Sequence, residues 1–268
     1  DAILRYRALT GSDTTLAKPT EQWLRVSLIR RFFSDNIDFI NLAKRHLEVA
    51  DFFELAPRII YPSGSNGRLG GKSTGLFLAQ HLLRRAADKG EKLFEGIKTP
   101  RTWYLTADCQ TEFLRHNQLE DVNEQKYKEL EQIRIEYPNI IQLFKNAPFP
   151  ADIVKGLSLA LDDFGECPLI VRSSSLLEDR TGSAFSGKYK SLFLPNQGSK
   201  KARMEALLDA IAEIYASVFG PDPILYRAEH GLLDFHEEMG ILIQEVVGAR
   251  IGPYVLPAYA GVAFSSNE

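Results

Sequence analysis

The sequence has few cysteines, no long apolar segment and no excess of one charge. Cys109 and Cys167 are the only cysteines, and they lack Cys-x-x-Cys spacing, so neither a zinc site nor a disulfide scaffold is indicated. Two buried, reduced thiols in a cytosolic protein are the simplest expectation. No apolar run approaches the roughly 20 residues that span a bilayer. A net charge of -3 gives no general attraction to nucleic acid or to an anionic membrane. These absences predict a cytoplasmic protein with neither a membrane nor a nucleic acid as partner.

What is present is typical of a folded soluble protein, with 44% hydrophobic and 25% charged residues. Helical spacing of apolar residues predicts helices over 21–55, 72–89, 150–164, 199–219 and 223–230. Residues 108–145 have a charged helical pattern that ends near Pro138 and Pro148. Strand composition occurs over 58–61, 100–106, 168–173, 189–194, 239–247 and 255–266. Because helices and strands mix irregularly, the predicted fold class is α+β.

The ends of the sequence suggest a piece of a longer polypeptide. The first residue is Asp1 rather than Met, and 259–266 has strand composition close to the last residue.

The first candidate for phosphate binding is the segment NGRLGGKSTGL, residues 66–76, which follows a short predicted strand and begins a helix. Gly70 and Gly71 let the backbone approach an anion, the helix N-terminus favours negative charge, and Lys72 adds a cation. The match to a Walker A loop is one residue short, because Asn66 stands where the first glycine belongs. The alternative interpretation is a glycine-rich turn capped by Ser73, with a solvated lysine.

A P-loop enzyme would also need a strand that ends in a metal-holding aspartate. The nearest candidate, LSLALDD at 157–163, lies inside a predicted helix. This placement argues against the P-loop class.

The second candidate is the segment LIVRSSSLLEDRTGSAFSGKYKSLFL, residues 169–194. It predicts a strand, a loop with glycines and a second strand, with Arg172 near the end of the first. An arginine beside apolar neighbours requires a paired anion. A phosphate is one such anion, and Glu178 or Asp179 is another. Ser175 and Glu178 also have the spacing of a helix capping box, in which case Thr181–Gly187 is an ordinary hairpin loop.

Five segments in order resemble the N-terminal nucleotide-binding domain of the phosphoenolpyruvate synthase and pyruvate phosphate dikinase family. In chain order they are GGKSTGL at 70–76, LIVRSSSLLED with GSAFSGKYKSLFL within 169–194, SVFGPDPILYRAEHG at 217–231, ILIQEVV at 241–247 and AGVAFSS at 260–266. The resemblance covers about 70–266, and the order of the segments makes it specific.

The resemblance implies an ATP-grasp-like fold, in which two α+β lobes hold ATP between them. Residues 1–56 would be a helical extension of unknown role. Residues 57–240 would form the first lobe, including a helical insertion at 108–148, and 241–268 would begin the second lobe.

The resemblance also implies roles for individual residues. Gly70, Gly71 and Lys72 would contact the ATP phosphates, and Arg172 would stabilise the phosphoryl group during transfer, so that Lys72 and Arg172 are the catalytic candidates. The loop that contains Thr181, Gly182, Ser183 and Gly187 would close over the phosphates. The segment with Gln244, Glu245 and Val247 would form the hinge beside adenine.

The implied activity is ATP-dependent phosphoryl transfer to a histidine on another domain and then to pyruvate. ATP and Mg²⁺ are the implied cofactors, with magnesium ligands expected beyond Glu268. The implied partners are the phosphohistidine and pyruvate or phosphoenolpyruvate-binding domains of the same polypeptide. The alternatives are a dikinase that acts on an antibiotic or a glucan, and a non-catalytic nucleotide-binding regulatory module.

Other catalytic patterns find little support. His236 begins an incomplete HExxH motif, because Gly240 stands where the second histidine would be needed, and a GxSxG elbow is absent.

Overall fold

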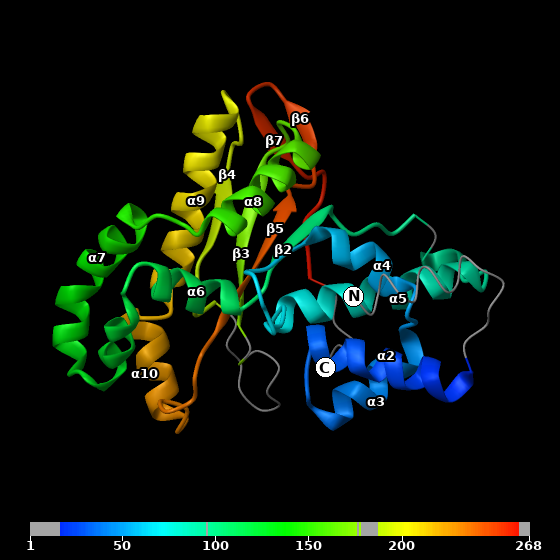
Figure 1. Ribbon diagram of the computed structural model, residues 1–268. Helices are drawn as coiled ribbons and strands as arrows, with labels where there is room; N and C mark the ends of the chain where they lie inside the picture. The colour runs from blue at the N-terminus through cyan, green and yellow to red at the C-terminus, as the bar shows by residue number, and fades with distance from the viewer. Residues whose placement is uncertain (1–16, 95, 176, 178–186, 263–268) are drawn as a thin grey trace.

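The computed structural model describes residues 17–94, 96–175, 177 and 187–262 (Figure 1). Its α-helices are α2 (Lys18–Phe32), α3 (Ile37–His46), α4 (Asp51–Leu55), α5 (Gly71–Asp88), α6 (Asp108–His116), α7 (Leu130–Asn146), α8 (Ala151–Phe164), α9 (Lys200–Ser217) and α10 (Pro221–Glu229). The 3-10 helices are η1 (Ala56–Arg58), η2 (Lys92–Phe94) and η3 (Glu120–Tyr127). The strands are β1 (Ile59–Ile60), β2 (Thr102–Leu105), β3 (Leu169–Ser175), β4 (Ser191–Leu194), β5 (Met239–Glu245), β6 (Ala249–Ile251) and β7 (Tyr254–Leu256). The mixture of helices with a mixed sheet confirms the α+β class.

Five strands form one mixed sheet in the order β1-β2-β5-β3-β4. β1 and β2 are parallel and are connected through α5, whereas each remaining pair is antiparallel. Of these five strands β5 is the last in the sequence, yet it lies in the middle of the sheet. The predicted lobe limit before Ile241 falls inside this central strand.

Helices cover both faces of the sheet, and successive strand residues point to opposite faces. Ile60 belongs to the larger core with side chains of α6–α9, whereas Ile59 belongs to a second core with side chains of α2–α5. Figure 1 shows the two helical groups on either side of the strands.

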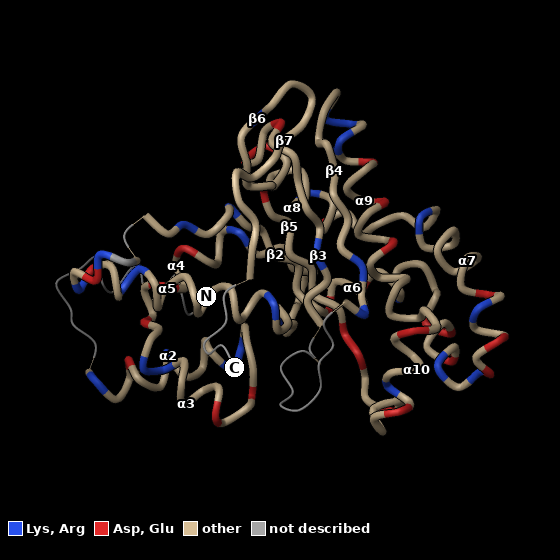
Figure 2. Tube along the Cα trace, turned by 180° about the vertical axis from the view of Figure 1, so that it is seen from behind, with Lys and Arg blue, Asp and Glu red and all other residues tan. Residues whose placement is uncertain are grey.

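The larger core includes helices from the predicted insertion. Phe113 of α6 and Phe144 of α7 are fully buried there. α7 continues through Pro138 and ends at Asn146, so the predicted end near Pro138 was wrong and the predicted end near Pro148 is confirmed. In Figure 2, basic and acidic residues are interspersed along α7. Glu213 of α9 pairs with Lys145 and Lys190, each with a closest N···O distance of 2.7 Å.

The second core is rich in phenylalanine. Phe33 lies 5.6 Å from Phe52 and 5.3 Å from Phe77, measured between ring centroids. The helical region predicted over 21–55 consists of three helices, and the first break precedes α3, where the Asn36 side chain accepts a hydrogen bond from the N–H of Phe39.

Two further predictions, one on the last strand and one on the cysteines, need correction. Strand β7 covers only Tyr254–Leu256 and pairs with β6 in a hairpin, while 259–262 is not a strand. Cys109 is buried as predicted, but Cys167 is exposed, because it lies in the loop between α8 and β3. Within the described residues, the structure contains no helix with the length and apolarity needed to cross a membrane.

Candidate functional site

The glycine-rich loop that begins α5 lies directly on the ends of β3 and β5. Gly70 has a φ of +77°, and a Cβ built on it would lie 1.9 Å from the carbonyl oxygen of Ser174. A Cβ on Gly240 would lie 2.7 Å from the carbonyl oxygen of Leu69. The backbone of the loop can approach the strands this closely because both positions are glycine.

Hydrogen bonds fix the start of α5 to β3. The Ser174 hydroxyl accepts from the N–H of Ser73 at 3.1 Å and lies 3.0 Å from the Ser73 hydroxyl oxygen. Both serines are buried. The N-terminus of an 18-residue helix, which carries partial positive charge, is therefore held against β3, with Lys72 immediately before the junction.

Arg172 lies on the same face of β3 as Ser174, about 7 Å along the strand, because alternate residues share a face. Its Nη1 donates to the Gln244 Oε1 of β5 at 3.2 Å. Ser191 of β4 is its register partner across the strand pair and is exposed. The structure thus brings the Lys72 junction, Arg172 and Gln244 to one face of the sheet.

The three serines after Arg172 have different surroundings. Ser174 bonds the loop, as described above. Ser175 accepts from the N–H of Leu177 at 2.9 Å and donates to Glu237. Ser173 faces the larger core. The pattern of three identical residues did not show which of them would support the loop.

Asp108, which was not among the predicted site residues, holds the first part of the glycine-rich loop, before Gly70. Its Oδ2 accepts from the N–H groups of Asn66 at 3.1 Å and Gly67 at 2.8 Å. Its Oδ1 accepts from the Thr106 hydroxyl at 2.6 Å. The turn between β2 and α6 therefore orders the glycine-rich loop. A short polar residue at the start of a helix was the only signal in the sequence.

The predicted hinge residues have distinct environments. Gln244 is buried, and its Nε2 donates to the Thr102 hydroxyl at 3.0 Å. The Glu245 carboxylate accepts from the backbone N–H of Arg101 at 2.9 Å and from its guanidinium at 3.1 Å. The backbone N–H of Glu245 donates to the Arg101 carbonyl, whereas Val247 lies beyond the strand and is 65% exposed.

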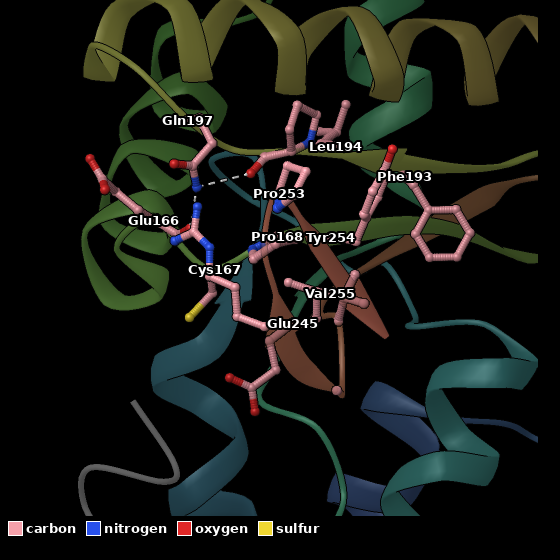
Figure 3. Close-up of a pocket in the computed structure, with 14 residues that line it drawn as sticks. Glu166, Cys167, Pro168, Phe193, Leu194, Gln197, Glu245, Pro253, Tyr254 and Val255 are labelled. Atoms are coloured by element: carbon pink, nitrogen blue, oxygen red, sulfur yellow. Dashed lines mark hydrogen bonds between the residues drawn. The ribbon is translucent and has the colours of Figure 1, made fainter. Parts of the chain in front are cut away.

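A cavity of about 680 Å³ lies beside this hinge segment, between the ends of β3, β4 and β5 and the β6–β7 hairpin. Figure 3 shows Glu166, Cys167 and Gln197 at one end and Phe193 at the other. Glu245 and Tyr254 also line it. The cavity combines apolar walls with several polar groups, as small-molecule sites do.

The predicted loop over the phosphates is described only at its end. Thr181, Gly182 and Ser183 lie outside the described residues, as do Glu178 and Asp179, the alternative partners of Arg172. Gly187 is exposed, with a φ of +76°, and precedes β4.

The structure also bears on two motifs for other classes of site. LSLALDD lies inside α8, as expected, which leaves the Walker B aspartate without its strand. His236 is exposed and lies 3.5 Å from Glu238.

The site has a neutral phenol but no metal-binding cluster among the residues that the structure describes. Burial raises the pKa of Tyr104, on the same face as Thr102, to about 12, so the phenol keeps its proton at neutral pH. Within the described ranges, no three His, Cys, Asp or Glu side chains gather so that they could hold a metal ion. The magnesium ligands that the resemblance implies lie beyond Glu268 and stay a prediction.

A comparison with known protein families covers most of the chain. Residues 66–268 match the family described as pyruvate phosphate dikinase, AMP/ATP-binding domain, so the chain belongs to this family. The prediction made from the five segments is confirmed.

Curated relatives support the same assignment. The rifampicin phosphotransferase of Bacillus subtilis is 24% identical over 179 residues, 65% of this chain and 19% of the relative. The phosphoenolpyruvate synthases of Deinococcus radiodurans and Escherichia coli are each 26% identical, over 175 and 185 residues. Each of these two matches covers 63% of this chain and 21% of the relative. The chain thus spans about a fifth of the length of the relatives it matches.

Proposed function

We propose that the chain binds the triphosphate of ATP between the N-terminus of α5 and Arg172, and that Lys72 and Arg172 stabilise the phosphoryl group during transfer. The observation that supports this proposal is the Ser73–Ser174 junction. It holds the cationic end of α5 against the strand and the face that carry Arg172.

These groups suit the chemistry of phosphoryl transfer. Phosphoryl transfer depends mainly on positioning the reacting groups and on neutralising the negative charge of the phosphates, since there is little covalent chemistry for the protein to perform. Gly70 and Gly71 allow the backbone to approach phosphate oxygens, the helix dipole favours an anion, and the guanidinium of Arg172 offers paired N–H donors. The loop with Thr181, Gly182, Ser183 and Gly187 would close over the phosphates in this proposal.

The adenine would lie at the hinge, beside the cavity that Glu245 lines. The backbone N–H groups of Glu245 and Val246 are already used, because they donate to the carbonyl groups of Arg101 and Pro168. The edge of the base would therefore meet the carbonyl groups of Glu245 and Val246 and the backbone of Val247. The proposed fold is ATP-grasp-like, with the second lobe beginning after Glu245 instead of before Ile241.

The complete protein would pass a phosphoryl group from ATP to a histidine on a domain outside this chain and then to pyruvate. A second acceptor class is favoured by a specific observation. Rifampicin phosphotransferases and phosphoenolpyruvate synthases match this chain at nearly the same identity, 24% and 26%. An antibiotic acceptor therefore fits the comparison as well as pyruvate.

Calorimetric ATP titration of the full-length protein tests the proposal. Lys72→Ala and Arg172→Ala should each weaken binding about 10-fold or more, because a charge-assisted hydrogen bond contributes about 1.5–3 kcal/mol. Arg84→Ala is the matched control, since Arg84 lies on the same helix but pairs with Glu54 at the surface. Wild-type affinity in both site variants would reject the proposed site. ATP binding without phosphohistidine would favour the regulatory module.

A further inference from the structure

A chain of hydrogen bonds crosses three adjacent strands and ends at Arg172. The Thr102 hydroxyl of β2 donates to the Pro100 carbonyl oxygen at 2.8 Å. The same hydroxyl oxygen accepts from Gln244 Nε2 at 3.0 Å, and Gln244 Oε1 accepts from Arg172 Nη1 at 3.2 Å. β2, β5 and β3 are neighbours in the sheet, so the chain runs across the strands (Figure 1).

Each member of this chain has one compatible orientation. A guanidinium only donates hydrogen bonds, so Gln244 must present its amide oxygen to Arg172. Its amide nitrogen then faces Thr102 and needs an acceptor. The Thr102 oxygen can accept because its own proton is directed to the main-chain carbonyl of Pro100. The fixed backbone therefore sets the orientation of the amide, and the amide sets the acceptor for Arg172.

Burial makes the hydroxyl difficult to replace. Thr102 is 4% exposed and Gln244 is 3% exposed, so bulk water does not reach the bond between them. Without the hydroxyl, the buried amide nitrogen would lack its acceptor. Rotation of the amide would then place two N–H donors against the guanidinium, which repels them.

We propose that Thr102 is a positioning residue that orients Arg172 toward its ligand through Gln244. This inference rests on the proposed function, because it takes the Arg172 ligand to be the phosphate of ATP. A guanidinium has five N–H donors, and the bond to Gln244 uses one of them. Holding that one donor fixes the direction in which the others point.

The test measures ATP affinity in the full-length protein by calorimetry. Thr102→Val keeps the shape of the side chain but removes the hydroxyl, and should weaken ATP binding about fivefold. Thr102→Ser restores the hydroxyl and should bind ATP within about twofold of wild type. Thr99→Val is the control, because it makes the same change in the loop before β2, outside this chain of hydrogen bonds.

A double-mutant cycle separates positioning from a general effect on the fold. In an Arg172→Ala background, Thr102→Val should have no further effect on ATP affinity. An equal loss with and without Arg172 would overturn the inference, as would wild-type affinity in Thr102→Val. Wild-type affinity in Arg172→Ala alone would instead reject the proposed phosphate role. Loss of affinity in Thr102→Ser equal to that in Thr102→Val would also overturn the role of the hydroxyl.

Discussion

Replacing Gly70 with alanine tests the closest approach in the candidate site. The new Cβ would lie 1.9 Å from the Ser174 carbonyl oxygen and 2.7 Å from the Ser174 hydroxyl oxygen. Ser174 belongs to β3, which is paired on both sides, so its carbonyl group cannot rotate away and the loop itself must move. Gly70 has a φ of 77° and a ψ of 170°, a region essentially restricted to glycine, which costs an L-residue about 1–3 kcal/mol, and overpacking adds about 1–3 kcal/mol. The expected loss is therefore about 2–6 kcal/mol of unfolding free energy.

Gly64→Ala provides the matched control for this prediction. Gly64 precedes the same loop and has a nearly identical φ of +78°, but nothing lies within 4 Å of the position that its Cβ would occupy. It should lose only the cost of a positive φ for an L-residue, about 1–3 kcal/mol. Urea unfolding gives both free energies, and ATP titration shows whether the loop has moved. Equal destabilisation of the two variants would refute the argument from close approach.

Three further predictions concern the packing and electrostatics of the fold. Phe144→Ala should cost about 3–5 kcal/mol in urea unfolding, whereas Leu143→Ala, at a position 48% exposed, should cost much less if α7 belongs to the core. The Glu213 pKa is lowered: burial alone would raise it, but bonds to two lysines outweigh burial. This stabilisation is present above the unfolded pKa near 4.5 and is lost as pH falls through the lower folded pKa, so Glu213→Gln should destabilise at pH 7 and progressively less as the pH falls below 4.5. Thiol alkylation followed by peptide mass spectrometry should modify Cys167 before Cys109, because Cys109 is buried and burial raises its pKa; equal rates would contradict this.

Local sequence signals predicted most of the elements. Pro150 and Pro168 precede α8 and β3 closely, because proline favours the start of a helix and a change of chain direction. Pro138 misled the prediction, since α7 continues through it. Packing of α7 against α9 and α10 compensates for a proline within the helix.

Tertiary contacts decided the features that the sequence did not reveal. The order of the strands depends on β5 entering between β2 and β3, and no local pattern encodes that position. Lys72 and Arg172 stood out because they belong to motifs. Thr102 did not, because its role comes from a bond to Gln244, 142 residues away in the sequence. Residues that act through distant partners need the fold before they can be recognised.

The structure also separates motif residues that packing explains from those that packing does not explain. Gly70, Ser174 and Gly240 meet where the loop crosses the sheet, and the fold requires small residues there with or without ATP. Arg172 is different. Within the described part of the chain its hydrogen-bond partner is the neutral Gln244 amide rather than a carboxylate. A neutral partner directs a half-buried guanidinium without neutralising its charge, and an anion such as phosphate would supply the missing charge. Of the described residues, Arg172 therefore supports the proposed phosphate site more than the glycines do, whereas its alternative partners Glu178 and Asp179 lie outside the described residues.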